Sequence, residues 1–206
     1  MEVLVDTMGE QVRLLASIWP MVSHSRIDDF EKQLLKADLP ATVDKVVCFE
    51  LTPLLSGNHD WNNPGAPPSY QGRFTVSRRG AYLHFAALRM AKVLEEKSGH
   101  PIRVYVQDAR YTQPEIELLE RMGITVVDGA YGAHEGFLMI DENTVVFSVL
   151  PNGPVRQLVM ETSMPAAMVC TPVNLDMNPD PDILCFPVSN EDINGGQLAW
   201  VPGSPW

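Results

Sequence analysis

The chain has 206 residues, of which 45% are hydrophobic and 20% charged, as expected for a globular domain with a buried core. Its net charge of −11 argues against nucleic acids and anionic membranes as partners, because both are bound through basic side chains. The sequence has no apolar run of membrane-spanning length, and its acidic N-terminal segment does not resemble a signal peptide. Three widely spaced cysteines fit a reducing compartment, so we expect a cytoplasmic protein.

The first third of the chain predicts a helix, a strand and a long loop. Residues 25–40 have helical spacing, with Ser25 as the cap and Pro40 as the stop. The apolar run at 45–49 predicts a strand. Residues 56–74 are rich in Gly, Pro and Asn, and loops of this length are often functional. We expect this loop to act as a lid over a binding site, with a surface insertion as the simpler alternative.

The middle of the chain alternates helices and strands. Residues 77–99 give the strongest helical pattern, from a Ser cap to a terminal Gly. Strands are predicted at 102–106 and 124–127, and the helix between them begins with a capping box formed by Thr112 and Glu115.

Further along, strands are predicted at 144–150 and 166–170, with a helix between them. Residues 137–141 suggest a short extra strand. Strands that alternate with helices are typical of βαβ units. The sequence therefore predicts an α/β fold: one Rossmann-like three-layer domain whose mostly parallel sheet has about five strands.

Three segments are expected along the chain. Residues 1–43 form an N-terminal helical extension, and residues 44–170 form the Rossmann-type domain. Residues 171–206 are rich in Pro, Asp and Asn and predict an irregular tail, whose tryptophans favour packing against the domain.

The central segments resemble a known family. The sequences "IRVYVQDARYTQPEIELLERMGITVV" and "TVVFSVLPNGPVRQLV" carry a strand that ends in Asp108, a helix capped by Thr112, a turn at Gly123, and a later strand that ends in Pro151. This framework, over roughly residues 44–170, resembles the "sensitivity to red light reduced" (SRR-like) domain. The resemblance implies a Rossmann-like fold and links to light and circadian signalling and to haem-related regulation, without a settled activity.

Two positions depart from the family pattern. The family has a Gly-Leu-Gly-like turn after its first strand, where this chain has Glu50, Leu51 and Thr52. The family often has a His after the Pro of the later strand, where this chain has Asn152. The departures suggest a divergent member with another task.

Ligands of open α/β sheets bind at the carboxyl ends of the strands. This geometry selects Glu50 and Thr52 after the first strand, Asp108 and Tyr111 after the second, and Asn152 after a later one. Two carboxylates in one partly buried cleft repel each other, so the pKa of one of them is expected to be raised. The protonated and the ionised carboxyl group would then form an acid/base pair. The alternative is that each carboxylate caps a local turn.

Other candidates come from the predicted lid and from the helix that follows it. An unperturbed histidine side chain has a pKa near neutrality, so His59 is a candidate catalytic partner, and Trp61 would line the same site. Arg79 lies in the first turn of the helix, where it could bind an anionic group. Tyr82 is one turn further along and could face the same site.

Cofactor signals are weak. Dinucleotide and P-loop sites need glycine-rich turns that are absent after the first strand. The histidines and cysteines have no metal-site spacing, and no pattern marks an axial haem ligand, so neither a metal nor a cofactor is predicted. S-adenosylmethionine lacks the terminal phosphates and stays open as a weaker alternative.

The preferred hypothesis is a small-molecule enzyme that uses cofactor-independent acid/base chemistry, of the isomerase, cyclase, lyase or hydrolase type. Glu50 would be the base, Asp108 the acid or an orienting group, and His59 a partner on the lid. The alternative is a regulatory or ligand-binding protein, linked to haem through the family resemblance. A homodimer is compatible with either hypothesis.

Overall fold

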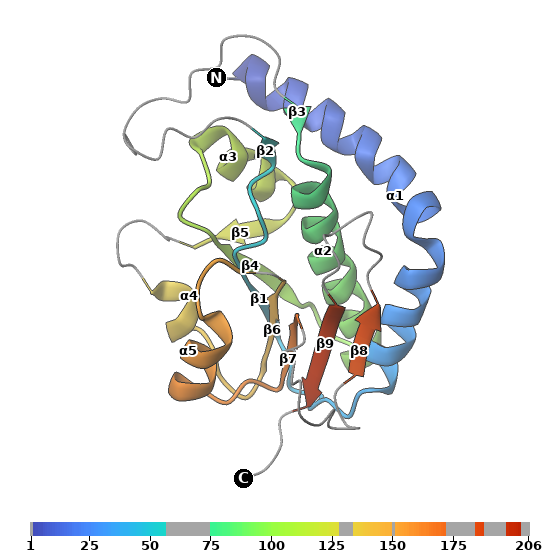
Figure 1. The fold of residues 1–206 in the computed structure, drawn as a ribbon, viewed down its shortest axis with the longest axis vertical. Coiled ribbons are helices and arrows are strands. Elements are labelled where there is room, and N and C mark those ends of the chain that lie inside the picture. Colours follow the sequence, from blue (N-terminus) through green and yellow to red (C-terminus); the bar gives the residue numbers. More distant parts are fainter. Residues whose placement is uncertain are drawn as a thin grey trace.

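The structure is a computed structural model that describes residues 2–56, 75–127, 134–149, 151–171, 184–187 and 197–202. A central sheet has the strand order β5-β4-β1-β6-β7-β9-β8 (Figure 1). Its first five members in that order are parallel: β5 (Ile124–Val126), β4 (Arg103–Gln107), β1 (Lys45–Phe49), β6 (Thr144–Ser148) and β7 (Ala167–Cys170). The predicted mostly parallel α/β sheet of about five strands is therefore confirmed.

Two strands of the C-terminal segment extend the sheet. β9 (Gln197–Pro202) pairs antiparallel with β7, and β8 (Leu184–Pro187) pairs antiparallel with β9. Neither strand was predicted from the sequence. The remainder of this segment beyond residue 171, which includes most of the predicted irregular tail, lies outside the described residues.

Helices cover both faces of the sheet, which gives the predicted three layers (Figure 1). One face is covered by α2 (Arg78–Ser98), and α1 (Glu2–Lys36) and α3 (Gln113–Arg121) pack beside it. The other face carries α4 (Glu135–Leu138) and α5 (Val155–Thr162). A small antiparallel pair, β2 (Leu55–Ser56) and β3 (Thr75–Val76), lies between β1 and α2 in the chain.

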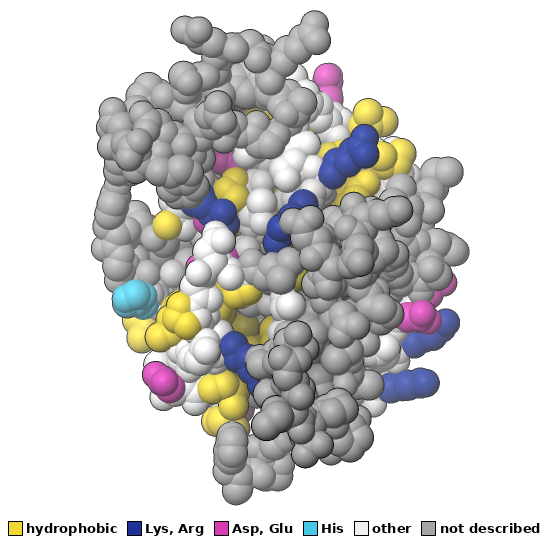
Figure 2. All heavy atoms as spheres, in the orientation of Figure 1, with side chains coloured by type: hydrophobic (Ala, Val, Ile, Leu, Met, Phe, Trp, Pro, Cys, Tyr) yellow, Lys and Arg dark blue, Asp and Glu magenta, His cyan; other side chains and the backbone are white. Residues whose placement is uncertain are grey.

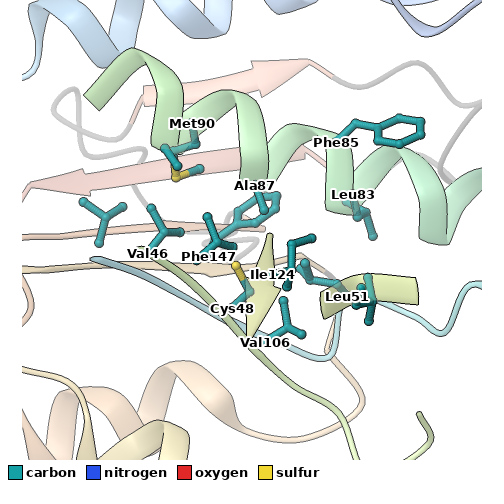
Figure 3. Packing of buried hydrophobic residues seen from close by; sticks show 14 of the residues in the cluster. Val46, Cys48, Leu51, Leu83, Phe85, Ala87, Met90, Val106, Ile124 and Phe147 are labelled. Carbon is teal, nitrogen blue, oxygen red and sulfur yellow. The ribbon is translucent and has the colours of Figure 1, made fainter. Parts of the chain in front are cut away.

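The buried strand β1 divides the core into two clusters. Side chains of a strand alternate between faces, so Val46 and Cys48 pack in the cluster with α2, and Val47 and Phe49 pack in the cluster with α5. Figure 3 shows the larger cluster, in which Phe147 also points toward α2. Full burial raises the pKa of the Cys48 thiol, which packs in the core as a small apolar side chain.

Two sequence predictions need correction. The first helix begins at Glu2 and not near Ser25, because Val5, Met8 and Val12 form a buried stripe at helical spacing. Residues 135–138 form helix α4 instead of the extra strand. The Phe137 ring stacks on Phe49 with ring centroids 4.3 Å apart, and a short apolar run does not distinguish a strand from a helix.

Candidate functional site

The backbone after β1 is strained. Glu50 has φ of 53° and Thr52 has φ of 74°, and among the described residues these are the two non-glycine positions with positive φ. Left-handed backbone costs an L-residue about 1–2 kcal/mol, more for a β-branched one such as threonine. The Glu50 N–H donates to the Gln107 carbonyl at 3.0 Å, which ties this turn to the end of β4. Such strain persists where the surrounding structure imposes it, often at functional sites.

The Glu50 side chain reaches across the sheet from β1 to the turn after β6. Its Oε2 accepts the backbone N–H of Asn152. Its Oε1 has no hydrogen-bond donor among the described residues and lies beside Gly153, where an added Cβ would be 3.2 Å away. The parallel strands follow the order of a doubly wound sheet, in which β1 and β6 meet at the topological switch point. Glu50 and Asn152 therefore lie where such folds bind ligands.

The buried Asp108 is paired with Arg110. Its Oδ1 accepts the Arg110 backbone N–H at 3.0 Å and Nε–H at 2.8 Å, and its Oδ2 accepts an Nη2–H at 2.6 Å. This bidentate pair is the main cause that raises the pKa of Arg110. Asp108 thus closes a local turn, as the alternative prediction had it, and also orients a guanidinium at the end of β4.

The first turn of α2 packs against the strained turn. Ser77 caps the helix as predicted, with its Oγ accepting the Gly80 N–H at 3.1 Å. A Cβ added to Gly80 would overlap the Pro53 carbonyl and come within 3.0 Å of the Thr52 oxygen, so only glycine fits this approach. Gly80 therefore lets the first turn of α2, which carries Arg79, approach Thr52 and Pro53 closely.

Family comparison supports the predicted resemblance. A family model for the SRR1 domain matches residues 31–183, which is most of the chain. The chain belongs to the SRR1 domain family. No significant match was found among curated proteins or among solved structures. Membership of the SRR1 family fixes the kind of domain and leaves its function to be argued from the strand-end residues.

The SRR1 domain also contains a buried histidine that was not singled out from the sequence. His84 is fully buried, and its Nδ1 lies 2.6 Å from the Gly80 carbonyl oxygen. A carbonyl only accepts, so Nδ1 carries the proton and Nε2 accepts the Tyr111 hydroxyl at 2.7 Å. Burial lowers the pKa of His84 to about 4, which keeps the ring neutral. Its place on the apolar stripe of α2 was the available sequence signal.

Glu115 performs more than the predicted capping role. Its Oε2 accepts the Thr112 N–H at 2.8 Å and the Thr112 hydroxyl at 2.6 Å, which confirms the predicted pairing. Its Oε1 accepts the Leu55 N–H at 2.8 Å, so α3 also holds the segment that follows the strained turn. Burial raises the pKa of Glu115, while these hydrogen bonds oppose the shift.

Not every predicted site residue reaches the strand ends. The Tyr111 hydroxyl is used by His84, and Tyr82 packs on the core, 6.4 Å from Phe85 between ring centroids. His59 and Trp61 lie outside the described residues. Within the part of the chain that the structure describes, no group of three His, Cys, Asp or Glu side chains could hold a metal ion. Among the described helices, none has the length and apolar character of a membrane span.

Proposed function

We propose that this SRR1 domain is a small-molecule enzyme that uses cofactor-independent acid/base chemistry, with Glu50 as the general base. The observation that carries the proposal is the position of the Glu50 carboxylate. It stands on strained backbone at the switch point, with one oxygen anchored by the Asn152 N–H and the other without a donor among the described residues. A base needs this combination of fixed orientation and a free lone pair.

The neighbouring residues take supporting roles in this proposal. Asp108 orients Arg110 through its hydrogen bonds. The negative charge of Glu50 also contributes to raising the pKa of Arg110, so Glu50 and Arg110 interact electrostatically. Asp108 is therefore assigned as the orienting group and not as the acid, because its oxygens are committed to Arg110. Proton return would fall to a group on the substrate or on the predicted lid, where His59 remains the candidate.

The proposed reaction class is proton transfer, because Glu50 acts in this proposal as a base and no redox cofactor takes part. Glu50 would remove a proton from a carbon or a hydroxyl of the substrate. The electron pair left behind would shift a double bond, close a ring or expel a leaving group, and the proton would return at another atom or leave with that group. These steps correspond to the isomerase, cyclase and lyase types; activation of water by the same base would give the hydrolase type.

The test screens many candidate substrates at once. Purified protein is incubated with a small-molecule extract in D2O, and the extract is profiled by mass spectrometry. Proton transfer by Glu50 predicts substrates that are consumed or gain deuterium with the wild type and remain unchanged with Glu50→Gln. Glu142→Gln is the matched control, because this exposed residue precedes β6 at the opposite end of the strand.

Two results would count against the proposal. A Glu50→Gln protein that is folded and as active as the wild type excludes this base. Native mass spectrometry that finds a tightly bound haem or S-adenosylmethionine excludes cofactor-free chemistry and favours the regulatory or transferase alternative.

A further inference from the structure

The guanidinium of Arg79 has no counter-ion in the described structure. Its Nε is buried and has no hydrogen-bond partner there. Buried polar atoms are almost always paired, so an exception calls for an explanation such as a missing ligand. The neighbouring Arg78 is exposed, although it lies in the same helical turn.

The surroundings of Arg79 make the unpaired charge more costly. Burial lowers the pKa of Arg79, and the nearby Arg110 lowers it further. The first turn of α2 contains no acidic side chain that could offset either effect. The positive charges of Arg79 and Arg110 repel each other in this partly buried position unless an anion lies between or beside them.

The two arginines are held in place by a buried hydrogen-bond bridge. Gly80, the residue after Arg79, is bound through its carbonyl to His84, and His84 accepts from Tyr111, the residue after Arg110. The bridge joins the first turn of α2 to the turn after β4. Figure 2 shows Lys and Arg side chains near the centre of the face where Figure 1 places the end of β1 and the start of α2.

The charges at the strand ends decide which anion fits. Arg110 interacts with two carboxylates, those of Asp108 and Glu50, whereas no carboxylate contributes to the pKa of Arg79. The charge of Arg79 is therefore not balanced by a described carboxylate, whereas Arg110 interacts with two of them. A singly charged carboxylate matches this arrangement. A phosphate dianion would bring a second negative charge toward Glu50 and Asp108.

We propose that Arg79 binds the carboxylate of a small monoanionic substrate, with Arg110 beside it, and so holds the substrate next to Glu50. Planar guanidinium and carboxylate groups form paired N–H···O bonds, which the free Nε–H of Arg79 can supply. This inference rests on the proposed function for the role of Glu50, but the binding step stands independently of turnover.

The test follows the Nε–H signals of arginine by NMR in isotope-labelled full-length protein. The probes are sodium propionate, its neutral analogue propionamide, and sodium phosphate, each titrated at constant ionic strength. The signal of Arg79, assigned by its loss in Arg79→Lys, is expected to shift saturably with propionate and not with propionamide. Arg79→Gln should weaken propionate binding, followed through the Arg110 signal, at least about tenfold, because it removes hydrogen bonds between two charged groups.

Arg78→Gln is the matched control and should leave propionate binding unchanged. Circular dichroism verifies that each variant is folded, and the wild-type titration decides the question even if Arg79→Gln does not fold. Three results overturn the inference: no saturable shift with propionate, unchanged affinity in folded Arg79→Gln, or tighter binding of phosphate than of propionate. The last result would instead assign a phosphorylated substrate.

Binding and catalysis fail separately in this design. Glu50→Gln should keep or improve propionate binding, because it removes a nearby negative charge. Saturable binding without any turnover by the wild type sustains the carboxylate site and removes the proposed enzyme. Turnover that depends on Glu50 but not on Arg79 sustains the proposed enzyme and removes the carboxylate site.

Discussion

The Glu50 carboxylate accepts the backbone N–H of Asn152, and this bond joins the ends of two neighbouring parallel strands from residues 102 positions apart. In many α/β proteins a glycine-rich turn at this place offers backbone N–H groups to a ligand phosphate. Here the protein's own carboxylate takes such a donor. Glu50, Leu51 and Thr52 stand after β1 where such a glycine turn would lie.

The contact between Gly80 and the Pro53 carbonyl gives the first prediction. Gly80→Ala should lower the free energy of unfolding by about 2–3 kcal/mol, because the added methyl meets backbone that cannot rotate away. Gly9→Ala is the control, since its Cβ would find Leu118 at an ordinary 3.7 Å, and the change should stabilise α1 by about 1 kcal/mol. Urea unfolding of both variants measures the difference. Equal effects would show that the approach of α2 to the turn is looser than described.

His84 predicts a pH dependence of stability. Its folded pKa of about 4 lies below the ordinary value of 6.5, so the unfolded chain binds the proton more readily. The free energy of unfolding should therefore fall as the pH drops from about 6.5 to about 4, by about 3 kcal/mol from this residue. Above pH 6.5 the contribution is constant.

His84→Gln removes this titration and serves as the comparison. The wild-type and variant curves of unfolding free energy against pH should converge as the solution is acidified, because only the wild type has a His84 to protonate. Carboxylates that titrate in the same range affect both proteins alike. Parallel curves would mean that His84 is not held neutral by burial.

Glu115 predicts a large effect on stability, because it holds both the start of α3 and the segment that follows the strained turn. Glu115→Ala leaves the N–H groups of Thr112 and Leu55 without their acceptor, and the free energy of unfolding should fall by about 3 kcal/mol. Glu120→Ala changes the same residue type at an exposed position of α3 and should cost less than about 0.5 kcal/mol. Thermal unfolding distinguishes them, and similar losses would contradict the buried role of Glu115.

The elements with local signals were the predictable part of this fold. Ser77 and Gly99 mark α2 in the sequence and bound it in the structure, because helix caps are chemistry between near neighbours. The bond from Glu115 to Leu55 was not predictable, since it joins positions 60 residues apart whose distance depends on the packed sheet.

The same division applies to the candidate site. Glu50, Asp108 and Asn152, which the strand-end rule selected, follow the carboxyl ends of β1, β4 and β6, and their role in a site stays a prediction. The rule did not show that Asp108 pairs with Arg110, because Asp and Arg two residues apart have no fixed side-chain geometry until the turn between them is formed. The neutral state of His84 likewise follows from burial, which a single helical stripe suggests but does not establish.

Thr52 gives the last prediction, which concerns the strained turn itself. Its φ of 74° is unfavourable for a β-branched residue. Thr52→Gly should therefore leave stability unchanged or raise it by about 1 kcal/mol, since the relief of strain offsets the greater freedom of glycine in the unfolded chain. Thr125→Gly, at an exposed position of β5, has no strain to relieve and should destabilise by about 1 kcal/mol. If Glu50 is positioned by this turn, Thr52→Gly should also reduce turnover in the D2O assay while the fold becomes no less stable. A variant that loses stability as Thr125→Gly does would indicate that the turn stores no strain.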